Sequence, residues 1–262
     1  MRVLVDVHTH ILPEVEEGLR FEDTLPRVNQ ILQAGTSHVL SLAPYQHDTT
    51  TAPLAKLEAV AEAYQEALDR RGLPLLLYPG HEALLEASLA DDVLAGKVSF
   101  ADLNQRYLFI RFPDQDLPAC TQEVLFSLLA HNIRPIISQP EKQACFQKNP
   151  QLLYDICEQG CSIQASATSL LPSSPAPAYR LAWDLVERRY LHVIASGAFC
   201  ASDSWRGDSL ASVYQYLEEK YGESFSFDLK QNAISLLNGD PMVTHYQLKK
   251  KRTFFDFFKR QK

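Results

Sequence analysis

Residues 3–13 of this 262-residue chain read VLVDVHTHILP, an apolar run that passes directly into alternating polar residues. The run Val3–Val7 has the length and the β-branched content of a buried strand. Alternate residues at a strand end point the same way, so His8 and His10 can place two imidazole rings on one metal ion. We expect Asp6 to lie close enough to orient one of these rings. The opening segment therefore predicts a buried first strand that carries a candidate metal-binding pair.

Six further apolar runs follow the first one and alternate with amphipathic helical segments. The predicted strands are Val3–Val7, His38–Leu42, Leu75–Tyr78, Tyr107–Ile110, Pro135–Ser138, Cys161–Gln164 and His192–Ala195. The predicted helices are Phe21–Ala34, Leu54–Arg71, Thr121–Ala130, Leu152–Glu158, Tyr179–Arg188 and Leu210–Tyr221. Each strand reads as a continuous buried run, which is typical of a parallel sheet covered by helices. The pattern predicts a closed barrel of seven β/α units, with an open doubly wound sheet as the structural alternative.

Composition and charge exclude several classes of protein. Hydrophobic residues make up 46% of the chain and charged residues 22%, which is ordinary globular composition. No apolar run approaches the ~18 residues that a membrane-spanning helix needs, and the N-terminus does not read as a signal peptide. The net charge of −7 argues against a nucleic-acid partner. No G-x-G-x-x-G turn follows the first strand, which argues against a dinucleotide-binding sheet. We therefore expect a cytoplasmic protein.

A carboxylate follows the third predicted strand. Glu82 lies in the segment Pro79-Gly80-His81-Glu82, directly after Leu75–Tyr78. In a β/α barrel the functional residues lie at the C-terminal ends of the strands, so Glu82 falls at the same end as His8 and His10. A solvated loop residue is the alternative interpretation of Glu82.

Motifs over nearly the whole chain resemble the PHP superfamily, and within it the tyrosine-protein phosphatases of bacterial capsule and exopolysaccharide loci. The matching segments are Asp6–Pro13, Pro79–Glu82, Arg106–Ile110 with Phe112-Pro113, Asn149–Tyr154, Gln164–Leu170 and Asn232–Gly239. The resemblance implies a PHP-type distorted (β/α)7 TIM-like barrel, which we expect to span residues 1–248. It also implies a cluster of divalent metals, typically manganese. Enzymes of that family use these metals to hydrolyse phosphotyrosine on the tyrosine kinase that controls polysaccharide chain assembly.

Five expected metal ligands are replaced in this chain. By the resemblance, a histidine becomes Tyr45, a bridging carboxylate becomes Arg111, and a second histidine becomes Gln139. An aspartate and a third histidine become Gly197 and Phe199. We expect Tyr45 and Phe199 to make the pocket more apolar.

The expected ligands that remain by position are His8, His10 and Glu82. Arg111 cannot ligate a metal, and its charge would repel a nearby divalent cation by several kcal/mol even at an effective dielectric of about 20. The sequence therefore predicts either no metal or one divalent ion, manganese or zinc, at this residual site. His47 and His81 are candidates to replace a lost ligand, and surface loop histidines are the alternative.

Basic side chains offer an anion site in place of the lost metals. Arg111 and Lys142 would face the pocket, and Arg206 matches a phosphate-binding arginine of the family. Guanidinium groups suit phosphate geometry without help from a metal. In the alternative interpretation, Arg111 and Lys142 pair with Glu82 and Glu141 and fill a disused pocket.

Residues 249–262 form a basic, aromatic C-terminal tail with the sequence KKKRTFFDFFKRQK. Its phenylalanines are flanked by cations, as in a segment that binds the surface of an anionic membrane. We expect a peripheral contact with the inner face of the membrane or with a partner. Alternatively, the tail docks on its own barrel or on a second subunit of a homo-oligomer.

These observations favour a degenerate phosphatase homologue of polysaccharide biosynthesis, a pseudophosphatase with little or no metal-dependent activity. It would bind phosphotyrosine, another anion or a partner. The partner would be a tyrosine kinase or polysaccharide co-polymerase, bound through the partner's own phosphotyrosine tail. The first alternative is an active metal-dependent phosphotyrosine-protein phosphatase that uses His8, His10 and Glu82, with Arg206 on the phosphate. A structural subunit that acts only by assembly is the third hypothesis.

Overall fold

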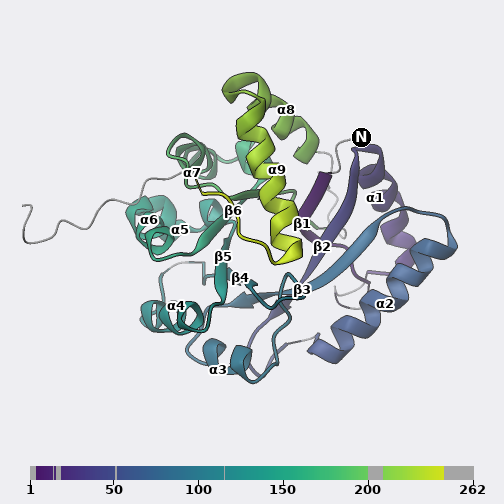
Figure 1. The fold of residues 1–262 in the computed structure, drawn as a ribbon, viewed down its shortest axis with the longest axis horizontal. Helices are drawn as coiled ribbons and strands as arrows, with labels where there is room; N and C mark the ends of the chain where they lie inside the picture. Colours follow the sequence, from purple (N-terminus) through teal and green to yellow (C-terminus); the bar gives the residue numbers. More distant parts are fainter. Residues whose placement is uncertain are drawn as a thin grey trace, which may run out of the picture.

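Parallel strands form a barrel surrounded by helices in the computed structural model (Figure 1). The structure describes residues 4–13, 15, 19–50, 52–114, 116–199 and 209–244. The predicted tail 249–262 lies outside these residues, so its separation from the barrel stays a prediction.

The strands are β1 (Leu4–His10), β2 (Thr36–Tyr45), β3 (Leu76–Leu84), β4 (Tyr107–Arg111), β5 (Arg134–Ser138), β6 (Ser162–Ser166), β7 (Val193–Ala195) and β8 (Ala198–Phe199). They form one parallel sheet in the order β7-β6-β5-β4-β3-β2-β1-β8. Two residues separate β7 from β8; β7 pairs with β6, whereas β8 pairs with β1. The seventh predicted strand, His192–Ala195, corresponds to β7, and the short strand β8, which the sequence did not predict, pairs with the other edge of the sheet. The predicted barrel is confirmed in place of the open sheet.

A glycine lies at the break between β7 and β8. Gly197 has a φ of 59°, in the left-handed region that glycine adopts without a steric cost. Its N–H donates to the carbonyl oxygen of His8 at 3.0 Å, which ties the break to β1. A Cβ at this position would lie 2.6 Å from Nε2 of Gln139, so a larger residue would clash.

The helices are α1 (Phe21–Gln33), α2 (Leu54–Arg70), α3 (Leu89–Leu94), α4 (Thr121–Ala130), α5 (Ala144–Lys148), α6 (Pro150–Glu158), α7 (Ala176–Glu187), α8 (Ser209–Tyr221) and α9 (Glu223–Asn238), with 3-10 helices at Pro140–Lys142 and Ala167–Leu170. The six predicted helices correspond to α1, α2, α4, α6, α7 and α8. The sequence did not predict α3, α5 or α9. Within the described residues, no helix is long and apolar enough to cross a membrane.

Helix α9 covers the end of the barrel at which the strands begin (Figure 1). Its Ala233 and Leu236 are buried in one cluster with Val5 of β1 and Val193 of β7. Burial of apolar surface at this end closes the floor of the barrel. The opposite end, where the strands finish, is left for polar side chains.

The first and third strands extend beyond their apolar runs into the polar residues of the predicted site. β1 continues through His10, and β3 continues through Glu82 to Leu84, paired with β2 up to Tyr45↔Ala83. The segment Pro79-Gly80-His81-Glu82, expected to follow its strand, is therefore part of the strand. The apolar run ends early because the side chains at this end of the barrel line a polar cavity.

Candidate functional site

A cavity of about 280 Å³ opens where β1, β3, β4 and β5 end. Its walls include five of the predicted site residues: His8, His10, Glu82, Arg111 and Lys142. The barrel brings these residues together from three strands and from the 3-10 helix that follows β5. The sixth, Arg206, lies outside the described residues, so its place in the site stays a prediction.

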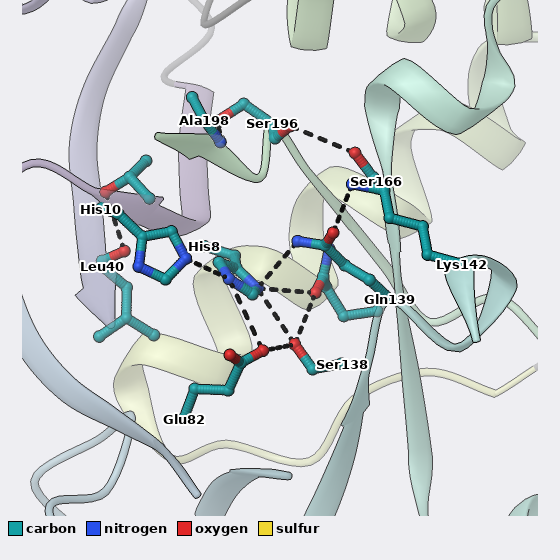
Figure 2. A network of polar contacts seen from close by, with 12 residues as sticks. His8, His10, Leu40, Glu82, Ser138, Gln139, Lys142, Ser166, Ser196 and Ala198 are labelled. Carbon is teal, nitrogen blue, oxygen red and sulfur yellow. Dashed lines mark hydrogen bonds and ion pairs between the residues drawn. The ribbon is translucent and has the colours of Figure 1, made fainter. Parts of the chain in front are cut away.

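The two histidines of β1 face each other across the cavity (Figure 2). Their Nε2 atoms are 3.0 Å apart, and Nδ1 of His8 lies 2.9 Å from Oε1 of Gln164. An amide oxygen only accepts, so Nδ1–H of His8 donates to Gln164 and Nε2 of His8 accepts from Nε2–H of His10. Burial lowers the pKa of His8 to about 4, which keeps its ring neutral at physiological pH.

Glu82 reaches the same cavity from β3. Its Oε1 accepts a hydrogen bond from the Ser138 hydroxyl and lies 3.8 Å from Nε2 of His8. Burial by itself raises the pKa of Glu82, but His8, Ser138, His10 and Arg111 together lower it below its ordinary value. The carboxylate is therefore ionised at neutral pH.

Arg111 ends β4, and Lys142 lies in the 3-10 helix Pro140–Lys142. Nζ of Lys142 donates to Oε1 of Gln139 at 2.5 Å. In the described part of the chain, neither cation forms an ion pair with Glu82 or Glu141. Glu141 instead is buried, accepts the N–H of Ser166 at 2.9 Å, and has a pKa raised by burial. The ion pairs of the filled-pocket interpretation are thus not formed, and both cations face the cavity.

Two polar residues that the sequence did not single out fix the His8 ring. Gln164 of β6 accepts from its Nδ1, and the Ser138 hydroxyl at the end of β5 lies 3.2 Å from the same atom. Asp6 was expected to orient a ring, and this prediction is wrong: its Oδ1 accepts the backbone N–H groups of His8 and Ser196. Polar residues at the ends of two buried runs were the signal that could have identified Gln164 and Ser138.

Three other candidates lie away from the cavity. Tyr45 was expected to line it, but its buried ring instead packs 5.2 Å from that of His81. Nε2–H of His81 donates to the carbonyl of Ala52, and its Nδ1 accepts the N–H of Ser99, both at 2.8 Å. Nδ1 of His47 lies 2.6 Å from a carboxylate oxygen of Asp92. Neither histidine replaces a lost ligand.

Strand periodicity explains the position of Tyr45. Leu40 and Leu42 of β2 belong to the cluster inside the barrel. Successive side chains of a strand alternate between its faces, so Tyr45 points outward, toward α3. The side chain of Phe199, also expected to line the pocket, lies outside the described part of the structure.

The residues present do not fit the metal cluster implied by the family resemblance. Among the described residues, no three His, Cys, Asp or Glu side chains are placed to hold a metal ion together. His8 and His10 share a hydrogen bond, and Glu82 is bound to Ser138. Arg111, which cannot ligate a metal, lines the same cavity.

Comparisons with known proteins agree with this fold. A family model described as "Capsular polysaccharide synthesis, CpsB/CapC" matches residues 4–238. The chain is 24% identical over 258 residues to the tyrosine-protein phosphatase YwqE of Bacillus subtilis (strain 168). The aligned region covers 97% of this chain and 100% of that protein. The chain is also 23% identical over 223 residues to CapC of Staphylococcus aureus, and that aligned region covers 82% of this chain and 87% of that protein.

The fold is also similar to a solved structure from work on YwqE of Bacillus subtilis and CpsB of Streptococcus pneumoniae, described as metal-dependent tyrosine phosphatases. The TM-score is 0.85 at 24% identity, over 95% of this chain and 100% of that one. Together with the match over residues 4–238, this establishes that the chain belongs to the CpsB/CapC family of capsular polysaccharide synthesis.

Proposed function

We propose that this chain is a pseudophosphatase of its family, whose barrel cavity binds phosphotyrosine or a related anion instead of hydrolysing it. One observation carries the proposal: Arg111 and Lys142 line the same cavity as the remaining candidate ligands His8, His10 and Glu82. Two cations thus stand where the family resemblance places a cluster of divalent metals. They supply the positive charge that a phosphate requires without a metal ion.

The geometry of the two cations suits a phosphate group. Lys142 is exposed, and its hydrogen bond to Gln139 can be exchanged for one to a ligand oxygen. Arg111 carries a planar guanidinium that can bind two phosphate oxygens at once. Ligand pockets usually measure about 300–1,000 Å³. The cavity, at about 280 Å³, is therefore suited to one side chain and not to a folded partner.

The relatives indicate where such a ligand would come from. YwqE is named as a tyrosine-protein phosphatase, and the family is one of capsular polysaccharide synthesis. The ligand we propose is the phosphotyrosine tail of a tyrosine kinase or polysaccharide co-polymerase of that machinery. Arg206 would add a third cation, and the tail 249–262 would hold this cytoplasmic protein at the inner face of the membrane.

One observation favours a second candidate, an active phosphotyrosine-protein phosphatase with a single manganese or zinc ion. The Nε2 atoms of His8 and His10 are 3.0 Å apart, and Oε1 of Glu82 lies 3.8 Å from the first of them. A small rearrangement would let these atoms approach one ion. We favour the pseudophosphatase because Arg111 faces the same space.

Metal content and peptide binding test the proposal together. Protein expressed with added manganese and zinc should contain less than about a tenth of a metal equivalent by mass spectrometry. A phosphotyrosine peptide should bind by calorimetry, and Arg111→Gln should weaken it at least about tenfold. The matched control is Arg70→Gln, because Arg70 is exposed on α2 and pairs with Glu66.

The other outcomes each overturn the proposal. About one metal equivalent that is lost in His8→Ala, together with phosphotyrosine hydrolysis at ordinary enzyme rates of about 1 s⁻¹ or more, would establish the active phosphatase. No binding at millimolar peptide would favour a subunit that acts only by assembly.

A further inference from the structure

A second and larger cavity lies at the opposite end of the barrel, where β4 and β5 begin. It measures about 730 Å³ and is bordered by the last residues of α3 and by the residues that directly follow α4 and α9. This volume lies within the range usual for small-molecule sites, about 300–1,000 Å³. The site of the proposed function lies where the strands end, so the two cavities are separate.

Two arginines line this second cavity, and no carboxylate is found among its described lining residues. Arg106 directly precedes β4, and Arg134 is the first residue of β5. The backbone N–H of Arg134 donates to the carbonyl of Arg106 at 2.6 Å. The two arginines are therefore neighbours at the start of adjacent strands. In a chain of net charge −7, such a local concentration of positive charge is unusual.

The guanidinium groups of these arginines have no acceptor in the described structure. Nε of Arg106 is buried and lacks a hydrogen-bond partner. The nearby carboxylate of Asp102 does not supply one, because it accepts the backbone N–H groups of Asn104, Arg106 and Tyr107 at 2.7–3.2 Å. A buried donor without an acceptor is costly unless a ligand or water completes it.

The helix ends at this cavity offer a competing explanation for the arginines. α3, α4 and α9 all finish here, and a helix C-terminus carries a partial charge of about −0.5. Three such ends attract cations, and so does the nearby carboxylate of Asp102, but none of them accepts a hydrogen bond from Nε of Arg106. Carbonyls in the last turns of α4 and α9 accept the backbone N–H groups of His131 and Gly239, and the carbonyl of Asn238 accepts from the Asn104 side chain. The helix ends therefore do not supply the missing acceptor of Arg106.

Part of the remaining lining is apolar. Val93 and Leu94 of α3, Phe100 and Ile133 supply this part, whereas polar side chains such as Asn104 and His131 supply most of the rest. Leu94 is 51% exposed, so its side chain offers apolar surface that a ligand could cover. The cavity thus presents two cations beside an apolar surface.

We propose that this cavity binds a small organic anion, in which a phosphate or carboxylate group is attached to an apolar body. The anionic group binds Arg106 and Arg134, and the apolar body covers Leu94 and Phe100. Both parts contribute, so an inorganic anion binds more weakly than an organic one of the same charge. This site is independent of the proposed function.

Calorimetry on the full chain tests the proposal with phenyl phosphate, phenylacetate and inorganic phosphate. Phenyl phosphate or phenylacetate should bind, and the comparison of the two identifies which anionic group is preferred. Inorganic phosphate should bind this cavity more weakly than phenyl phosphate. Arg134→Gln should weaken binding at this cavity at least about tenfold, whereas Arg70→Gln, on α2, should leave it unchanged. Any binding of phenyl phosphate that is lost in Arg111→Gln belongs to the other cavity.

A second pair of variants keeps the test valid if Arg134→Gln does not fold. Leu94 is exposed, so Leu94→Glu and Leu94→Gln should both fold, and they differ only in charge. The glutamate should weaken binding of the anion well beyond the glutamine, because it places a carboxylate beside the two arginines. The proposal is overturned if neither organic anion binds at millimolar concentration, if binding is lost only in Arg111→Gln, or if the two Leu94 variants bind equally.

Discussion

Replacing Asp6 by asparagine is expected to remove a loss of stability that the protein suffers as pH rises from 4 to 7. Asp6 is 1% exposed, and its Oδ1 accepts the N–H of Ser196 at 3.0 Å and that of His8 at 3.4 Å. The amide oxygen of asparagine can accept both of these bonds. The substitution therefore keeps the local geometry and removes only the titrating group.

The size of the effect follows from the pKa of the buried carboxyl group. Burial raises the pKa of Asp6 from 3.8 to about 6, although hydrogen bonds from Ser196 and His8 oppose the rise. Because the folded value lies above the unfolded one, the stability contribution is fully present below pH 3.8 and is lost as pH rises through about 6. A difference of about two pKa units corresponds to about 3 kcal/mol. The stability of Asp6→Asn relative to the wild type should thus increase by about 3 kcal/mol between pH 4 and pH 7.

Urea unfolding at pH 4, 5, 6 and 7 measures this change, since each curve gives a free energy of unfolding. Asp240→Asn is the matched control, because Asp240 is exposed and the same charge is removed from the surface. Its stability should follow that of the wild type to within about 0.5 kcal/mol at every pH. The reasoning is refuted if the Asp6→Asn and wild-type stabilities change in parallel over this range.

Two further predictions concern packing. Gly239→Ala should lower the free energy of unfolding in urea by about 1–3 kcal/mol more than Gly35→Ala does. A Cβ at Gly239 would lie 2.6 Å from Oδ1 of Asp102, whereas a Cβ at Gly35 would meet no atom within 4 Å. Both glycines have positive φ, so equal losses in the two variants would contradict this account. Phe146→Ala should lower the free energy of unfolding by about 3–5 kcal/mol, because Phe146 is fully buried and its ring lies 5.3 Å from that of Phe112. A loss below about 1 kcal/mol would show that neighbouring side chains fill the space left by the ring.

The secondary structure could be predicted where a single face or a continuous run was apolar. The missed α3 spans only Leu89–Leu94, too short for helical periodicity to be recognised. In α9 the buried side includes polar residues: Asn232 is buried, and its side-chain amide donates to the carbonyl of His192 at 2.9 Å. A buried asparagine weakens the apolar pattern, and only the tertiary contact explains why it is there.

Five residues that line the site could be predicted from the sequence, but the contacts between them could not. His8, His10, Glu82, Arg111 and Lys142 do line one cavity, because the ends of neighbouring parallel strands meet at one edge. The sequence did not reveal that Gln164 fixes the ring of His8, since β1 and β6 lie near opposite ends of the strand order and come close only when the barrel closes.

The sequence by itself determined the barrel class, through the alternation of apolar runs and helices, and the family, through motifs that persist in order. Through the family resemblance it also predicted that Arg111 replaces an expected metal ligand. Only the tertiary structure decided which atoms face each other, because closure through the split β7 and β8 brings β1 beside β7. The same applies to the second cavity: Arg134 lies in none of the motifs, and it meets Arg106 beneath three helix ends only because β4 pairs with β5.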